Sequence, residues 1–318
     1  MEEQRPVRIG ISSCLLGEQV RYDGGHKLDR FLVDTLGRYV DYVPVCPEVE
    51  CGLGIPRESM HLEGDPENPR LVTTRTGVDL TDRMKRWASN RVKELESEDL
   101  SGFIFKSRSP SSGMERINVF NEKGQPVKRG VGIFARAFMD HFPNVPVEED
   151  GRLNDPGLRE NFIEAIFTLG RWRDLCREKK TVGSLVRFHT AHKLLLLSHS
   201  RKHYTEMGRL VAGGKKLSPS GLYTEYGDLL VQALKVKGTS KKNSDVLMHA
   251  MGYFKKVLTS REKEELLEYL KMYNSGQIPL VVPLTIIRHY IMKYDQPYLK
   301  EQLYFHPHPL EVMLRNHV

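Results

Sequence analysis

The chain has 318 residues, of which 39% are hydrophobic and 28% charged, a composition typical of a globular protein with about two domains. The first residues are polar and charged, so no secretory signal is expected. The longest apolar stretch, 278–287, is interrupted by Pro279 and Pro283 and is shorter than the roughly 20 residues of a membrane helix. These features argue against a membrane protein and predict a cytoplasmic location, where thiols serve metal binding or catalysis more often than disulfides.

Charge is distributed unevenly along the chain. Residues 1–150 contain 21 Lys and Arg against 25 Asp and Glu, whereas residues 151–318 contain 27 against 16, so the net charge changes from −4 to +11. A mildly acidic part followed by a strongly basic part suggests a catalytic unit beside a unit that binds a polyanion. A basic surface that is merely solvated is the alternative.

Short apolar segments alternate with helical patterns in residues 1–150. The expected strands are 8–13, 41–45, 102–106 and 145–148, and the expected helices are 29–36, 78–95 and 130–142. This alternation predicts a doubly wound α/β domain with a mostly parallel sheet. Ligands of such sheets bind beyond the carboxyl ends of the strands, and Cys14, Cys46 and the loop 107–113 fall there.

From residue 151 onward the pattern is helical. Residues 151–184 are expected to form a helical connection and residues 185–318 an all-α domain. The expected helices of this domain are 186–211, 222–235, 245–257, 260–274 and 283–294. The predicted fold is therefore an α/β N-terminal domain followed by an all-α C-terminal domain.

Three of the four cysteines lie where loops follow apolar segments. Cys14 comes after the first expected strand, and Cys46 and Cys51 come after the second. Three thiolates without an obvious fourth ligand fit an iron–sulfur cluster with one open iron, or zinc completed by His or water. Buried structural cysteines are the third alternative, and the residues alone leave all three open. Cys176, in the helical part, is expected to be a packed thiol.

The motifs around these thiols resemble those of a known family, the TudS family of thiouracil desulfidases. The order and spacing agree across Ser13-Cys-Leu-Leu-Gly17, Arg21-Tyr-Asp-Gly24, Cys46-Pro-Glu48, Gly52-Leu-Gly-Ile-Pro-Arg57 and Lys106-Ser-Arg-Ser-Pro-Ser-Ser-Gly113. The resemblance implies an α/β domain with a 4Fe-4S cluster on three cysteines, whose fourth iron binds the substrate sulfur. Stand-alone members carry a cysteine where this chain has Ser112. Cys14 and Cys46 therefore transfer directly, and Cys51 is expected to replace the missing ligand.

The loops near the thiols carry the catalytic candidates. Glu48, two residues from a ligand, is expected to deprotonate the attacking water, with orientation of its loop as the alternative role. Ser109 and Ser111 are expected to hydrogen-bond the ring or the water, or else to form a turn. The candidates for substrate binding in this part are Asp23, Arg57 and Lys106. No nucleotide cofactor is implied, because the hydrolysis needs no redox step and no phosphate-binding glycine motif is present.

The helical part has a resemblance of its own. Segments 187–199, 246–255 and 278–284 are similar to the YbgA-type C-terminal domain, and the two-part arrangement is similar to desulfidases that act on 4-thiouridine in tRNA. Arg201 and Lys202 belong to one of several basic clusters expected to bind RNA. A helical stripe of histidines is predicted to face RNA or to be buried and hydrogen-bonded; zinc binding is a less favoured alternative. The stripe contains His189, His192, His199 and His203.

These observations predict an iron–sulfur enzyme that converts 4-thiouridine in tRNA to uridine. The nearest alternative is the same chemistry on free thiouracil or thionucleosides, with the helical part serving as a lid or an oligomerisation surface. The other alternative is a non-catalytic RNA-binding protein with a structural metal site. The oligomeric state is not indicated by the sequence.

Overall fold

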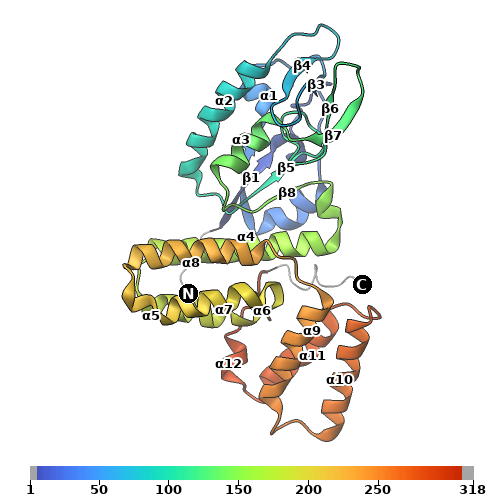
Figure 1. The fold of residues 1–318 in the computed structure, drawn as a ribbon. Coiled ribbons are helices and arrows are strands. Elements are labelled where there is room, and N and C mark those ends of the chain that lie inside the picture. The colour runs from blue at the N-terminus through green and yellow to red at the C-terminus, as the bar shows by residue number, and fades with distance from the viewer. Residues whose placement is uncertain (1–5, 310–318) are drawn as a thin grey trace. The chain divides into compact units, whose positions relative to one another are not determined.

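The computed structural model describes residues 6–309, and the chain divides into two compact units, Met1–Asn154 and Asp155–Val318 (Figure 1). The first unit combines strands and helices and the second contains helices, so the predicted fold class is confirmed. Among the described residues, none of the helices has the length and apolar character needed to cross a bilayer.

A four-stranded, fully parallel sheet forms the centre of the α/β unit. Its order is β2-β1-β5-β8, with bounds β1 (Val7–Ser12), β2 (Val40–Val45), β5 (Gly102–Phe105) and β8 (Val147–Glu149). Every residue of β5 is buried, as expected for a strand with both faces covered. Gly10 permits close packing of β1 against β5, because a Cβ atom there would lie 2.2 Å from the Phe103 ring.

A second four-stranded sheet was not predicted from the sequence. Its order is β4-β3-β6-β7, and it joins two antiparallel hairpins through a parallel pair, β3 with β6. The bounds are β3 (Met60–Glu63), β4 (Arg70–Thr73), β6 (Ile117–Phe120) and β7 (Pro126–Gly130). These strands are short and separated by turn residues, so segment 60–73 has the sequence pattern of a polar loop.

The helices of the α/β unit are α1 (Pro47–Glu50), α2 (Thr81–Glu94) and α3 (Ile133–His141). Helices α2 and α3 pack against the parallel sheet through a core that includes Ala88, Phe103, Phe134 and Phe138. In place of the helix expected at 29–36, the chain forms a π-helical turn, Phe31–Thr35, followed by a 3-10 turn, Leu36–Arg38.

The second unit packs nine described helices around one core (Figure 1). Their bounds are α4 (Pro156–Arg177), α5 (Val182–Ala191), α6 (Lys193–His199), α7 (Arg201–Ala212), α8 (Pro219–Leu234), α9 (Ser240–Met251), α10 (Ser260–Asn274), α11 (Val281–Lys293) and α12 (Pro297–Lys300). Segment 151–184 was expected to be a connection, but α4 contributes Leu169 and Trp172 to the core of this unit.

The single helix expected over 186–211 is divided into α5, α6 and α7. The first break is at His192, which has φ −92° and ψ 1°. The second is at Ser200, which is extended and whose hydroxyl accepts a hydrogen bond from the His203 amide as the N-cap of α7. Serine favours helix starts over helix interiors for this reason. The four histidines consequently lie on three helices and their junctions.

Candidate active site and metal centre

Topology brings three separate segments to one edge of the parallel sheet. Strands β1 and β2 are paired in register up to Ser12 and Val45, and Ile11 is paired with Ile104 of β5. The residues after these strands therefore emerge side by side at the carboxyl edge, where α/β sheets bind ligands. Cys14, Cys46 and the loop 106–113 are the segments that emerge there. The Lys106 amide donates to the Ser12 hydroxyl at 2.9 Å and ties the loop to β1.

These segments line a cleft of about 1220 Å³ within the α/β unit. Cys14, Cys46, Glu48, Ser109 and Ser112 all contribute to its wall. The cleft thus combines thiols, a carboxylate and hydroxyls, which is the residue chemistry expected of a metal-assisted hydrolytic site.

Both cleft thiols are largely buried, with Cys14 9% exposed and Cys46 8% exposed. Burial raises the pKa of Cys14 to about 11, with Lys106 opposing and Glu48 reinforcing the shift. Burial, followed by the Glu48 charge, raises the pKa of Cys46 to about 12. The Cys46 thiol donates weakly to the Val20 carbonyl at 3.9 Å and to Glu48 Oε2 at 3.6 Å. A metal that binds these sulfurs at neutral pH must therefore displace their protons.

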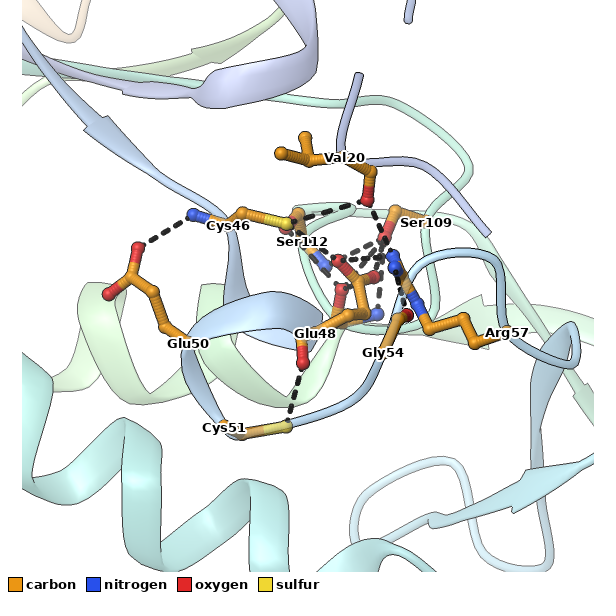
Figure 2. Close-up of polar contacts among 10 residues, drawn as sticks. Val20, Cys46, Glu48, Glu50, Cys51, Gly54, Arg57, Ser109 and Ser112 are labelled. Atoms are coloured by element: carbon orange, nitrogen blue, oxygen red, sulfur yellow. Dashed lines mark hydrogen bonds and ion pairs between the residues drawn. The ribbon is translucent and has the colours of Figure 1, made fainter. Parts of the chain in front are cut away.

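Glu48 is held from two sides within the cleft (Figure 2). Its Oε1 accepts a short hydrogen bond from the Ser111 hydroxyl and a weaker one, at 3.5 Å, from the Ser109 hydroxyl. Its Oε2 lies 3.5 Å from the Arg57 guanidinium. The structure therefore brings together the three residues predicted as catalytic, Glu48, Ser109 and Ser111.

Cys51 does not join the other two thiols. It is the C-cap of α1, its Sγ donates to the Glu48 carbonyl at 3.3 Å, and it packs against a hydrophobic cluster that includes Leu62 and Met84. Figure 2 shows its sulfur across the α1 turn from the Cys46 sulfur. The residues between Cys46 and Cys51 form a single helical turn, which carries the second thiol to the opposite face. The geometry therefore argues against Cys51 as the third ligand.

Ser112 lines the cleft together with Cys14 and Cys46. It is 3% exposed, its amide donates to the Ser109 hydroxyl at 3.1 Å, and its own hydroxyl lies 3.5 Å from that of Ser111. Within residues 6–309, no three His, Cys, Asp or Glu side chains are arranged to hold a metal ion. At this cleft the chain presents the thiols of Cys14 and Cys46 and, at position 112, a hydroxyl, together with the Glu48 carboxylate.

The residues predicted to bind substrate in this unit have different surroundings. Arg57 lies inside the cleft and, besides Glu48, donates to the Val20 carbonyl at 3.0 Å. Lys106 also lines the cleft but is bound to Asp150 at 2.8 Å. Burial opposes ionisation of Asp150, but hydrogen bonds from Lys106 and Ser107 outweigh it and lower the pKa of this carboxyl. Asp23 is an exposed turn residue that accepts from the Gly25 amide at 3.0 Å.

The predicted RNA-binding residues of the helical unit separate into exposed and interior groups. Arg201 and Lys202 are exposed at the start of α7. His189 is half-buried and stacks on Tyr204 with ring centroids 5.0 Å apart. His192 is 2% exposed and its Nε2 lies 3.2 Å from Arg171 Nε. Interior packing therefore removes His192 from the surface that RNA would contact.

Several residues in or beside the cleft were not singled out from the sequence. Asp150, beside the cleft, forms an ion pair with Lys106, and the acidic run at the end of the last strand is the only sequence signal for it. Tyr22, His61 and Phe120 add aromatic surface. His61 and Phe120 belong to the second sheet, which the sequence pattern conceals, so their approach to the thiols could not be foreseen.

Comparison with known proteins agrees with this two-part architecture. Residues 9–150 match the family described as 2-thiouracil desulfurase, and residues 193–309 match the family described as Protein of unknown function (DUF1722). The chain is 32% identical over 152 residues to the uncharacterized protein YbgA of Escherichia coli (strain K12), covering 48% of this chain and 90% of that protein. It is 32% identical over 113 residues to the uncharacterized protein YbbK of Bacillus subtilis (strain 168), covering 33% of this chain and 72% of that protein.

Among solved structures, the 4Fe-4S-dependent thiouracil desulfidase TudS is similar to this chain at 30% sequence identity, with a TM-score of 0.40. The alignment covers 48% of this chain and 97% of TudS. The family match of residues 9–150 assigns the α/β unit to the desulfurase class. The chain belongs to the family that joins a 2-thiouracil desulfurase domain to a YbgA-like DUF1722 domain.

Proposed function

We propose that the α/β unit is a desulfidase that uses a 4Fe-4S cluster to remove sulfur from a thiolated pyrimidine, and that its substrate is 4-thiouridine in tRNA. The observation that carries the chemistry is the convergence of Cys14, Cys46 and the Glu48 carboxylate on one cleft. Membership of the 2-thiouracil desulfurase family supports the reaction. The motifs around Cys14 and Cys46, which resemble those of the cluster-binding TudS enzymes, support the choice of cofactor.

The donor set fits a cluster whose third protein ligand is an oxygen. Thiolates are the usual ligands of iron–sulfur clusters, and Cys14 and Cys46 line the same cleft as Ser112. We assign Cys14 and Cys46 as the residues that hold the cluster and the Ser112 hydroxyl as the third ligand. When bound, a cluster with one iron free of protein ligands supplies a Lewis acid that prefers sulfur to oxygen.

The protein residues supply the hydrolytic half of the reaction. Glu48, oriented by Ser111 and Arg57, takes a proton from water as the water oxygen attacks the carbon that carries sulfur. The carbon–sulfur bond then breaks, a carbonyl forms, and the sulfur leaves as sulfide with the protons of the water. No atom changes its oxidation state overall, so no electron donor is required. A general base of this kind contributes roughly 10²–10⁴-fold to the rate.

The assignment to tRNA is supported by charge. Residues 151–318 carry 27 Lys and Arg against 16 Asp and Glu, and Arg201 and Lys202 are exposed on α7. Phosphate contacts by such residues provide sequence-independent affinity for RNA. The second candidate substrate is free thiouracil, which the description of the matched family favours.

Mass spectrometry of digested tRNA separates the two substrates. Protein reconstituted anaerobically with iron and sulfide is incubated with tRNA that contains 4-thiouridine, and in parallel with free 4-thiouracil. Conversion of 4-thiouridine to uridine in tRNA is the expected result. Turnover of the free base alone, with the tRNA unchanged, would contradict the tRNA assignment while retaining the desulfidase chemistry.

A further inference from the structure

The cleft of the α/β unit is basic although the unit as a whole is not. Eight Lys and Arg side chains line the cleft against three Glu, whereas residues 1–150 contain 21 Lys and Arg and 25 Asp and Glu. Positive charge is therefore concentrated at the site of the chemistry. A cleft lined by charge of one sign attracts ligands of the opposite sign.

The inner cations of the cleft are already paired with carboxylates. Arg57 lies 3.5 Å from Glu48, and Lys106 lies 2.8 Å from Asp150. The outer cations are different. Lys27, Arg108 and Lys128 are exposed, and within the described residues none of them forms an ion pair. These side chains are available to an anion that arrives from solvent.

Arg116 is a fourth exposed cation at the cleft, and its only described carboxylate partner, Glu115, is 3.8 Å away. Together, Lys27, Arg108, Arg116 and Lys128 form the rim of the cleft. The rim residues belong to separate segments: Lys27 lies in the loop before the π-helical turn Phe31–Thr35, Arg108 in the loop after β5, Arg116 directly before β6, and Lys128 on β7.

Two rim residues have a positive φ, a backbone conformation that non-glycine residues rarely adopt. Arg108 has φ 60° and Arg116 has φ 56°. The other described non-glycine residues with positive φ are Asp99 and Asp295, which follow helical segments and whose short polar side chains tolerate this region. Arginine has no such local compensation, so this conformation is strained. Strain of this kind concentrates at binding and catalytic sites.

The cleft also has aromatic surface and ample room. Tyr22 is 45% exposed, and its ring lies beneath the Arg21 guanidinium at 5.5 Å. His61 and Phe120 make an edge contact with centroids 5.3 Å apart. Exposed aromatic rings stack on unpaired bases of single-stranded RNA. The cleft volume of about 1220 Å³ exceeds the roughly 300–1,000 Å³ of typical small-ligand pockets.

We propose that the rim binds phosphates of an RNA strand, so that the α/β unit itself recognises a polynucleotide rather than a free base. This inference rests on the proposed function, because the thiols and Glu48 lie in the same cleft as the rim. Cations on separate segments suit successive phosphates of a strand better than one phosphate of a mononucleotide. Recognition of RNA is then shared by both units.

The test compares two full-length variants that lose the same charge. The rim variant is Lys27→Ala, Arg108→Ala and Lys128→Ala. The control variant is Arg86→Ala, Lys93→Ala and Arg129→Ala, which removes three exposed cations of the same unit that do not line the cleft. Arg129 is a stringent control, since it adjoins Lys128 on β7.

Binding of a fluorescently labelled RNA hairpin is measured by anisotropy over a range of salt concentrations. The slope of log K against log salt should fall by about 3 in the rim variant, roughly one for each lost phosphate contact, and should be nearly unchanged in the control. With reconstituted protein, kcat/KM should fall at least about tenfold on RNA containing 4-thiouridine, because phosphate contacts dominate affinity. On free 4-thiouracil it should stay at the wild-type value.

Equal slopes in the two variants would overturn the proposal, as would an equal loss of turnover on RNA and on the free base. An equal loss on 4-thiouridine monophosphate and on RNA would overturn the assignment to a strand, because a single phosphate would then account for the rim. Failure of the wild-type protein to release sulfide from every substrate would contradict the proposed function, and the anisotropy measurement would still decide the role of the rim.

Discussion

The two units use polar residues in opposite ways. In the α/β unit, parallel strands deliver Cys14, Cys46 and Glu48 from distant parts of the sequence to one open cleft. In the helical unit, His192 and His199 are 2% and 0% exposed and are hydrogen-bonded within the core. The ends of parallel strands bring reactive side chains to an edge that ligands can reach. A helical pattern of histidines does not show whether its members are exposed, nor whether they lie on one helix.

The largest effect is expected from removing a cleft thiol. Cys46→Ala should abolish cluster binding and lower the rate of sulfide release by more than about 10³-fold, because metal coordination is lost together with the Lewis acid. Cys176→Ala, which removes a thiol packed against the core of the helical unit, should leave both quantities unchanged. Iron and sulfide content, visible absorption and sulfide release measure the outcome. Retention of the cluster by Cys46→Ala would remove the basis for the metal centre.

The second prediction concerns which residue is the third ligand, Ser112 inside the cleft or Cys51 outside it. Ser112→Ala should lose most of the bound iron, because Ser112 lines the cleft, whereas Cys51→Ala should keep it, because that thiol packs on the far side of α1. Ser112→Cys should bind the cluster more tightly and resist oxygen longer, since thiolate is the better ligand for iron. The measurement is iron content before and after exposure to air. The opposite ranking of Ser112→Ala and Cys51→Ala would restore Cys51 as the ligand.

A variant of Glu48 should change the rate of the reaction without changing the amount of cluster bound. Glu48→Gln should lower kcat by roughly 10²–10⁴-fold, the usual contribution of a general base, while iron content stays at the wild-type level. Glu122→Gln, at an exposed position in the β6–β7 turn, is the matched control. Single-turnover rates with reconstituted protein give the comparison. A wild-type rate in Glu48→Gln would leave the carboxylate with only a loop-orienting role.

The smallest effect concerns the interior histidines of the helical unit. Burial, with a further contribution from Lys193, lowers the pKa of His189 to about 4, and burial lowers the pKa of His192 well below its ordinary value. The unfolded chain takes up protons near the ordinary value of 6.5, but the folded chain does not. Stability that is present above pH 6.5 is therefore lost progressively as the pH falls toward 4.

For His189 the loss should reach about 1–2 kcal/mol after allowance for its partial exposure. Thermal unfolding followed by circular dichroism at pH 7.5 and pH 5 measures it. His189→Gln should reduce the difference between the two midpoints, and His26→Gln, at an exposed position, should not. Identical midpoints at both pH values would show that these imidazoles titrate freely.

Sequence patterns predicted the parallel strands and the site residues that directly follow them. β1, β2 and β5 are apolar runs bounded by turn residues, so their carboxyl ends could be located. The position of Cys51 could not be predicted, because it depends on a single helical turn that reverses the direction of its side chain. The rim was also hidden, since Arg116 and Lys128 belong to or adjoin short strands of a sheet that has no strong hydrophobic pattern.

The order β2-β1-β5-β8 has a consequence for biogenesis. Residue 112 follows β5, which must insert beside β1 before the three proposed ligand positions meet. A nascent chain that has emerged only through residue 51 contains Cys14 and Cys46 but lacks β5 and the loop that carries Ser112. Pairing between strands far apart in the sequence, such as β1 and β5, is slow. With the proposed ligand set, the cluster can therefore be bound only after β5 has paired with β1.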